Sequence, residues 1–365
     1  MPSAKKLGLT TILLLFLHGC VSAPSVPSAR PVIKPAPAIT TPPQTKPQPE
    51  TVRPDSREAP VQLVSELHDI WRSFPGKTGI AVQRIDGGWT TGKRLGEWFP
   101  QQSVSKLWVA LTVLDQVDSG RLRLDQKVRI TMDDLAVFHQ PIRERVVANG
   151  TIEVPVSELL EQAITASDNT ANDSLLRAVG GPQSVRGFIE RKQLGRIRFG
   201  PGERLLQSQI AGVAWQQDYA LGRRFYAARE AVPVERRKAA LDAYLADPID
   251  GASPDAIAAA LAKLARGDLL SPASTRLLMA MMERTSSGPN RLKAGVPADW
   301  RFGHKTGTGQ ILSPVSTGYN DIGIMTAPDG TRYAVVVMIA STTASVPDRM
   351  AMMQSVSRSV ARHHR

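Results

Sequence analysis

Apolar positions along the chain predict helices and strands in its first and last parts and a helical middle. Residues 61–74 show helical periodicity, and residues 79–82 form a short apolar strand. Residues 107–117 open a long middle region, up to residue 282, that has helical spacing nearly throughout. We therefore expect one helix and a strand before a mainly helical region.

The C-terminal part predicts an antiparallel sheet and a closing helix. Apolar runs at 321–326 and 333–340 flank Pro328-Asp329-Gly330, which is typical of a β-hairpin. Residues 348–363 then carry apolar side chains at helical spacing. The pattern predicts an α+β fold, in which N- and C-terminal helices pack on an antiparallel sheet beside an all-helical subdomain.

The N-terminus has the features of an export signal. Lys5 and Lys6 precede the apolar run 7–17, which is too short to span a bilayer. Leu17-His18-Gly19-Cys20 resembles the lipobox of bacterial lipoproteins, and Cys20 is the only cysteine. We expect residues 1–20 to be a lipoprotein signal peptide with lipid attachment at Cys20. A cut after Ala23 would instead release a soluble form.

Proline recurs every few residues between the signal and the first helix. Residues 21–60 cannot build a core and are expected to form an extended tether, and residues 61–365 are expected to form one domain. Lipid attachment and the tether together predict a monomeric protein in the periplasm, anchored to a membrane, with the outer membrane preferred to the inner.

Neither the net charge nor the spacing of the histidines indicates a nucleic-acid partner or a metal site. The net charge is +12, but basic residues are spread along the chain and export would separate the protein from nucleic acid, so no nucleic-acid partner is expected. The six histidines lack metal-ligand spacing. We expect no metal and no cofactor.

The first chemical motif is Ser103-Val104-Ser105-Lys106, at the start of the helix expected over 107–117. At three residues' separation, the Lys106 amine can reach the Ser103 hydroxyl. A serine needs a base to act as a nucleophile, and a lysine can serve if desolvation or a nearby cation, such as Lys305, lowers its pKa. Alone, the motif also fits an N-capping serine followed by a surface lysine.

Two further motifs follow in order. Ser167-Asp168-Asn169 separates two apolar periodic segments and is expected in a helix–helix connection. Lys305-Thr306-Gly307 follows residues 300–304, which read as an edge strand. Each alone fits a helix cap or a glycine-rich turn. Together the three motifs supply a nucleophile with an amine, a second hydroxyl beside an amide, and a cation.

This set of SxxK, SDN and KTG motifs resembles the class A serine β-lactamases and the related penicillin-binding proteins, from about residue 61 to the C-terminus. The resemblance implies a serine β-lactamase-like α+β fold and acyl transfer through Ser103. It makes Ser167 the proton relay to the leaving nitrogen and Asn169 a ligand of the substrate amide. Asp168 is expected to be structural.

The resemblance also implies the rest of the substrate site. Lys305 and Thr306 would face the substrate carboxylate. The Thr308 and Ser103 N–H groups would form an oxyanion hole, with each donor contributing on the order of 3 kcal/mol. Gly307 would allow backbone to approach the substrate closely.

One arginine is a further candidate for binding the substrate carboxylate. Arg291 precedes the KTG motif where some family members use an arginine for this purpose, and a guanidinium suits bidentate carboxylate binding. A solvated arginine is the alternative.

A glutamate that can act in deacylation is the sequence feature that distinguishes a β-lactamase from a penicillin-binding protein. Residues 202–207, Gly-Glu-Arg-Leu-Leu-Gln, resemble the family's Ω-loop motif, which implies that Glu203 is the general base for deacylation and that Gln207 replaces a water-holding asparagine. The arginine and aspartate that usually close this loop have no counterparts around Pro201 and Gln216. Asp173 replaces a usual asparagine and would raise the pKa of Glu203 if both were charged and close.

Residues 217–251 form an apparent insertion after this loop, helical and basic in pattern. We expect a solvated helical hairpin.

These features favour a class A serine β-lactamase that hydrolyses β-lactams through an acyl-Ser103 intermediate and confers resistance. A DD-peptidase or transpeptidase acting on peptidoglycan, in which Glu203 is incidental, is the alternative. A non-catalytic β-lactam or cell-wall binding module is a third possibility, against which intact Ser103, Lys106 and Lys305 argue.

Overall fold

The computed structural model describes residues 58–364. The expected signal peptide, Cys20 and nearly all of the proline-rich segment lie outside the described residues. Within residues 58–364, no helix is both long and apolar enough to cross a bilayer.

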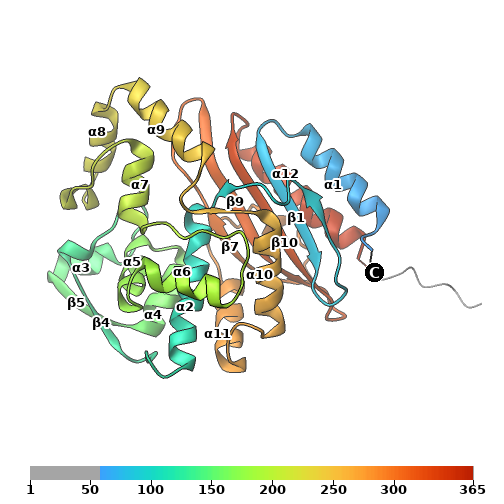
Figure 1. Ribbon diagram of the computed structural model, residues 1–365, viewed down its shortest axis with the longest axis horizontal. Coiled ribbons are helices and arrows are strands. Elements are labelled where there is room, and N and C mark those ends of the chain that lie inside the picture. The colour runs from blue at the N-terminus through green and yellow to red at the C-terminus, as the bar shows by residue number, and fades with distance from the viewer. Residues whose placement is uncertain (1–57, 365) are drawn as a thin grey trace, which may run out of the picture. The chain divides into compact units, whose positions relative to one another are not determined.

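An antiparallel sheet forms the centre of the described chain (Figure 1). Its strands run in the order β2-β1-β10-β9-β7, and β8 pairs with β9. The strands are β1 (Lys77–Arg84), β2 (Thr90–Lys93), β7 (Arg301–Gly307), β8 (Ile311–Leu312), β9 (Val315–Thr326) and β10 (Arg332–Thr342). The hairpin expected near the C-terminus is confirmed, since β9 and β10 are its two strands.

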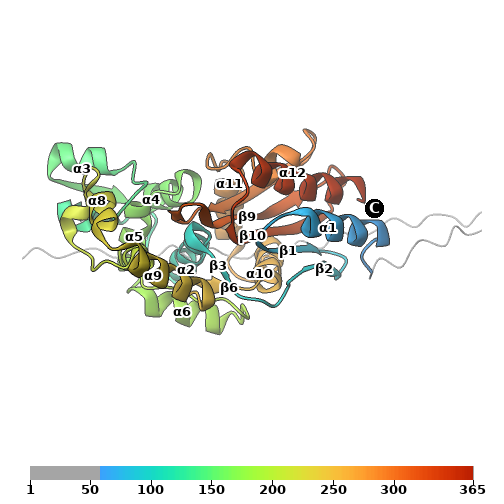
Figure 2. The same ribbon diagram turned by 90° about the horizontal axis from the view of Figure 1, so that it is seen from above.

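Helices cover both faces of this sheet (Figure 2). Side chains alternate along β10, so that Val335 and Val337 share a buried cluster with Leu63 and Val356, whereas Val336 lies in the larger cluster on the other face. One face is covered by α1 (Val61–Ser73) and α12 (Val346–Arg362), and the other by α10 (Pro254–Arg266) and α11 (Pro272–Glu283). Burial on both faces explains why residues 334–340 of β10 are apolar without interruption.

Helix α2 (Lys106–Asp118) lies at the centre of the helical part of the chain. Its first nine residues are all buried, and it contacts α5 and α6. The other helices are α3 (Arg143–Asn149), α4 (Val156–Glu161), α5 (Asn169–Ala178), α6 (Pro182–Arg191), α7 (Glu203–Ala211), α8 (Arg224–Ala231) and α9 (Val234–Ala246). Because residues 107–114 are apolar except for Thr112, this part of α2 has no solvent-facing side and is buried by its neighbours.

The expectation that the middle of the chain is nearly all helical was wrong at two places. Strands β4 (Lys127–Thr131) and β5 (Thr151–Pro155) pair antiparallel, and β3 (Phe99–Pro100) pairs with β6 (Gly251–Ala252). Val128 and Ile130 alternate with exposed basic residues, which is the period of a strand. Five residues are too few for this alternation to stand out between helical segments.

Candidate active site

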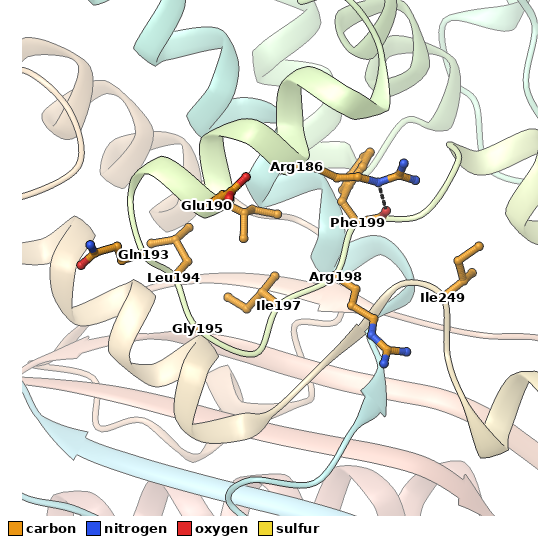
Figure 3. A pocket seen from close by; sticks show the side chains of 10 residues that line it. Arg186, Glu190, Gln193, Leu194, Gly195, Ile197, Arg198, Phe199 and Ile249 are labelled. Atoms are coloured by element: carbon orange, nitrogen blue, oxygen red, sulfur yellow. Dashed lines mark hydrogen bonds between the residues drawn. The ribbon is translucent and has the colours of Figure 1, made fainter.

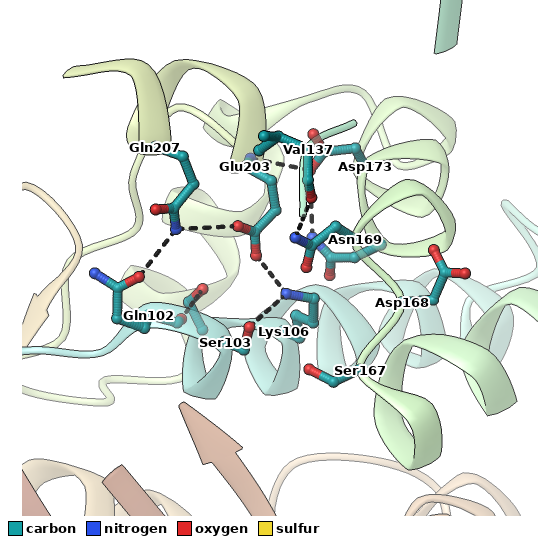
Figure 4. Close-up of polar contacts among 12 residues, drawn as sticks. Gln102, Ser103, Lys106, Val137, Ser167, Asp168, Asn169, Asp173, Glu203 and Gln207 are labelled. Carbon is teal, nitrogen blue, oxygen red and sulfur yellow. Dashed lines mark hydrogen bonds and ion pairs between the residues drawn. The ribbon is translucent and has the colours of Figure 1, made fainter. Parts of the chain in front are cut away.

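Ser103 and Lys106 lie where the N-terminal end of α2 meets the main sheet. Ser103 lies in a short 3-10 helix, Gln102–Ser105, that leads directly into α2. Lys106 Nζ donates to Ser103 Oγ at 2.8 Å, as the three-residue spacing predicts (Figure 4). The amide of Ser103 is near the start of this helical segment, where N–H groups have no acceptor within the helix.

The same amine also contacts Glu203. Lys106 is fully buried, and its Nζ donates to Glu203 Oε1. Glu203 is the first residue of α7 and is itself buried. The serine, the lysine and the glutamate, which are up to 100 residues apart in the chain (203 − 103 = 100), therefore form one connected group.

Ser167 and Lys305 form the opposite side of the site. Ser167 adopts a left-handed conformation, with φ of 61°, between a π-helical turn and α5. Lys305 Nζ donates to Ser167 Oγ at 2.9 Å. Burial, and next the charge of Lys106, hold the pKa of Lys305 well below its usual value. The structure thus brings both lysines and both serines of the three motifs together.

The other two residues of the SDN motif bind the chain itself. Asp168 is the N-cap of α5, and its carboxylate accepts hydrogen bonds from the amides of Ala171 and Ile142 at 2.8 and 2.7 Å. Burial raises the pKa of Asp168. Asn169 Nδ2 donates to Val137 O at 2.7 Å, which fixes the orientation of the Asn169 amide. The structural role expected for Asp168 is confirmed.

The KTG motif is part of a strand. β7 continues through Gly307 and pairs with β9, so Lys305-Thr306-Gly307 does not form a turn. A Cβ at Gly307 would lie 2.4 Å from Gln101 O. The close approach that requires this glycine is therefore to the segment before Ser103, whereas the sequence suggested the substrate.

Arg291 is buried rather than solvated. Its guanidinium donates to Gly307 O and to Thr308 Oγ1 at 2.8 and 2.6 Å, and it stacks 3.8 Å from the ring centre of Tyr319. Thr306 Oγ1 lies 2.7 Å from Ser287 Oγ. Arg291 thus fixes the end of β7 and places its positive charge within hydrogen-bonding distance of the Thr308 hydroxyl.

Asp173 lies beside Glu203 in a different arrangement from the one expected. Its Oδ1 accepts a hydrogen bond from the backbone N–H of Glu203 at 3.1 Å, at the N-terminus of α7. Desolvation, and next the charge of Glu203, raise the pKa of Asp173 to about 6. Burial of this carboxyl thus outweighs the hydrogen bond from the Glu203 amide, which favours the ionised form of Asp173.

The loop that carries Glu203 is held by contacts that the sequence did not reveal. Arg204 donates to Asp133 O and to Gln217 Oε1 at 2.9 and 3.1 Å. At the far end, Asp250 accepts a hydrogen bond from the backbone N–H of Gln102 at 2.7 Å. Asp250 thus ties the end of the inserted segment to the residue before Ser103, while Arg204 holds the loop itself.

The inserted segment is helical, but it is not a solvated hairpin. Helix α9 packs against α7 through a small apolar cluster of Leu206, Ile210, Leu241 and Tyr244. The Tyr244 hydroxyl is within hydrogen-bonding distance of Gln102 and Asp250, at 2.6 and 2.8 Å. Most of the segment's basic residues are exposed, as the sequence pattern suggests, but Arg229 is half-buried and donates to Gln310 Oε1 at 3.1 Å.

Four site residues were missed by the sequence reasoning: Gln102, Gln310, Tyr244 and Asp250. Gln102 precedes the nucleophile and Gln310 follows the KTG segment, so adjacency to a motif was a usable signal. Tyr244 and Asp250 carried no such signal.

A hollow of about 700 Å³ lies apart from these residues, between α6 and the segment that follows it (Figure 3). Its lining includes Arg186, Phe199 and Ile249 but none of the expected site residues. Among residues 58–364, no group of three histidine, cysteine, aspartate or glutamate side chains is placed to hold a metal ion.

Comparison with known proteins identifies similar enzymes. The family model described as the beta-lactamase enzyme family matches residues 62–364. Beta-lactamase VEB-1 of Pseudomonas aeruginosa is 29% identical over 279 residues, which are 76% of this chain and 82% of that protein.

Solved structures that are similar to this chain are also β-lactamases. A β-lactamase from Chitinophaga pinensis DSM 2588 matches with a TM-score of 0.67 and 28% identity, covering 81% of this chain and 97% of that chain. An ancestral class A β-lactamase, GNCA, matches with a TM-score of 0.64 and 32% identity, covering 82% of this chain and 99% of that chain. The expected resemblance and the expected α+β serine β-lactamase fold are confirmed.

Proposed function

Because the chain belongs to the beta-lactamase enzyme family, with the fold of its class A members, we propose that it hydrolyses β-lactams through an acyl-Ser103 intermediate. The observation that carries this proposal is the buried contact of Glu203 with Lys106, whose amine is 2.8 Å from Ser103 Oγ. A carboxylate base beside an activated serine supplies both acylation and deacylation.

In acylation, Ser103 Oγ attacks the lactam carbonyl and its proton leaves through Lys106. The C–N bond of the ring breaks, and Ser167, which accepts a hydrogen bond from Lys305, delivers its proton to the departing nitrogen. The proton that Lys106 took from Ser103 then passes to Ser167, so that both Lys106 and the Ser167 hydroxyl return to their starting states. The N–H groups of Ser103 and Thr308 stabilise the oxyanion. Lys305, Thr306, Asn169 and the cation of Arg291 surround the place where the substrate carboxylate and amide would bind.

In deacylation, Glu203 takes a proton from a water molecule as that water attacks the ester carbonyl. The C–O bond to Ser103 breaks, and the proton returns to Ser103 Oγ. In a penicillin-binding protein, Glu203 would have no catalytic role. Its carboxylate is nevertheless buried against Lys106. The geometry therefore favours hydrolysis over peptidoglycan transfer.

We also propose that the enzyme acts as a monomer in the periplasm, attached through lipid at Cys20, and that it confers β-lactam resistance. The support is the lipobox-like sequence before Cys20. A Cys20→Ser variant should lose fatty-acid labelling and move from the membrane to the soluble fraction of the envelope. Unchanged labelling would contradict lipid attachment at this residue.

The test of the catalytic proposal is a mass-resolved time course of the purified protein with a chromogenic cephalosporin. Wild type should turn over, whereas Glu203→Ala should accumulate a Ser103 adduct and lose about 1,000-fold in kcat. Glu235→Ala, an exposed glutamate of α9, is the matched control and should behave as wild type.

A lasting adduct in both wild type and Glu203→Ala would instead indicate a penicillin-binding protein. The absence of an adduct and of turnover in both would refute acyl transfer from β-lactams.

A further inference from the structure

Three buried glutamines meet beside Glu203, and each comes from a different part of the chain. Gln102 precedes the nucleophile, Gln207 lies one turn after Glu203 on α7, and Gln310 follows the KTG segment. Their exposed fractions are 1, 4 and 8%. Buried amides must be paired, so the direction in which each one points has an energetic consequence.

The amides form a chain with one direction. Arg229 donates to Gln310 Oε1 at 3.1 Å, and Gln310 Nε2 donates to Gln207 Oε1 at 3.0 Å. Gln207 Nε2 then donates to Gln102 Oε1 at 2.9 Å (Figure 4). Each amide accepts at its oxygen from one neighbour and donates through its nitrogen to the next.

The chain ends on a phenol and a carboxylate. Gln102 Nε2 donates to the Tyr244 oxygen at 2.6 Å, and the Tyr244 hydroxyl donates to Asp250 Oδ1 at 2.8 Å. Burial, and next the charge of Asp250, raise the pKa of Tyr244 well above its usual value, so the phenol keeps the proton that it donates. Burial raises the pKa of Asp250 to about 6, so at pH 7 this carboxyl is ionised and the chain runs from a cation, Arg229, to an anion.

These two ends determine how every amide points. A guanidinium can only donate and an ionised carboxylate can only accept, so turning any one amide over would place two donors or two acceptors together on both of its sides. Arg229 and Tyr244 both belong to the inserted segment, on α8 and α9, and Asp250 lies at its end.

The direction of the chain matters for Glu203. Gln207 Nε2 is also 3.4 Å from Glu203 Oε2, while Lys106 donates to the other carboxylate oxygen. Glu203 thus faces a donor at each oxygen. At the other side, Asp250 Oδ2 accepts from the backbone N–H of Gln102, which has a left-handed φ of 54° immediately before Ser103.

We propose that Arg229, Tyr244 and Asp250 are positioning residues that orient the three-glutamine chain and, through Gln207, hold Glu203 and its water for deacylation. This inference rests on the proposed β-lactamase function. The inserted segment is then a support of the hydrolytic step, contributed by residues that never touch the substrate.

The test is Tyr244→Phe in the full chain. Phenylalanine keeps the ring in its apolar cluster and removes only the oxygen that links Gln102 to Asp250. The rate at which the Ser103 adduct decays should fall about 10-fold, with kcat and KM lowered together and kcat/KM within about twofold of wild type. Tyr219→Phe, in the same segment, is the control, since its side-chain contacts within residues 58–364 are made by the ring.

A second variant, Arg229→Met, removes the donor at the other end and should slow adduct decay in the same way without disturbing the Tyr244 cluster. It keeps the inference testable if Tyr244→Phe folds poorly. Adduct decay as fast as in wild type in folded Tyr244→Phe and Arg229→Met would overturn the inference, as would a fall in kcat/KM with unchanged adduct decay. Wild-type turnover in the same assay tests the proposed function separately, and its absence would refute both.

Discussion

The two halves of the active site are held by different kinds of interaction. Ser103 and Lys106 stand at the start of α2, the best buried helix of the larger apolar core, and Lys305 lies on the main sheet. Glu203 and Gln207 lie on α7, which packs through two small clusters of four and three buried residues and through the polar chain of three glutamines.

The difference indicates how each chemical step depends on the fold. Apolar packing is non-directional, so the acylating half should persist as long as the core does. A polar chain depends on the angle and polarity of every link, so the deacylating half can fail while the fold stays intact. Acylation and deacylation should therefore be separable by mutation.

The largest effect is expected from removing the group that joins the two halves. Lys106→Ala should lower kcat/KM at least about 1,000-fold and abolish rapid formation of the Ser103 adduct, because the serine loses its base and buried Glu203 loses its partner. Stopped-flow acylation with mass detection measures this. Lys127→Ala, an exposed lysine on β4, is the control. Normal adduct formation in Lys106→Ala would show that Lys106 is not needed for acylation.

An intermediate effect on stability is expected from truncating apolar side chains, and its consequence for adduct decay should differ between the two apolar clusters. Leu111→Ala, in the larger cluster, should lower the free energy of unfolding by about 3 to 5 kcal/mol, and Leu241→Ala, in the small cluster under α7, by about 2 kcal/mol. Only Leu241→Ala should slow decay of the Ser103 adduct at temperatures where both variants are folded. Urea unfolding and adduct decay measure the two quantities. Equal slowing in both variants would contradict the separation.

The most restricted effect is expected from the carboxyl beside Glu203, since it concerns stability over a limited pH range. The pKa of Asp173 is raised from 3.8 to about 6, so its protonated form stabilises the fold, and this contribution is lost as pH rises from about 4 through about 6. Asp173→Asn keeps the acceptor for the Glu203 amide and removes the charge. Its stability relative to wild type should therefore rise between pH 4 and pH 7, by up to about 3 kcal/mol.

Thermal unfolding of wild type and Asp173→Asn across this pH range measures the change. Asp299→Asn, an exposed aspartate, should show no such trend. A stability difference between wild type and Asp173→Asn that is independent of pH would show that Asp173 does not titrate in this range.

Local patterns were sufficient for the parts of the site that depend on neighbours in sequence. The contact of Ser103 with Lys106 follows from helical spacing, and the capping role of Asp168 follows from the preference of aspartate for the start of a helix. The hairpin of β9 and β10 also follows from alternation around a turn. The short strands β4 and β5 were missed because five residues give too little periodicity.

Sequence by itself thus determined the family, the fold class, and the contact of Ser103 with Lys106, because helical spacing, capping preferences and motif order are local properties. Tertiary structure alone decided that Arg291 is buried, that the KTG motif is a strand, and that Tyr244 reaches Gln102, 142 residues earlier in the chain. The physical reason is that a buried polar group takes whichever partner long-range packing brings within reach, and no local pattern specifies that partner.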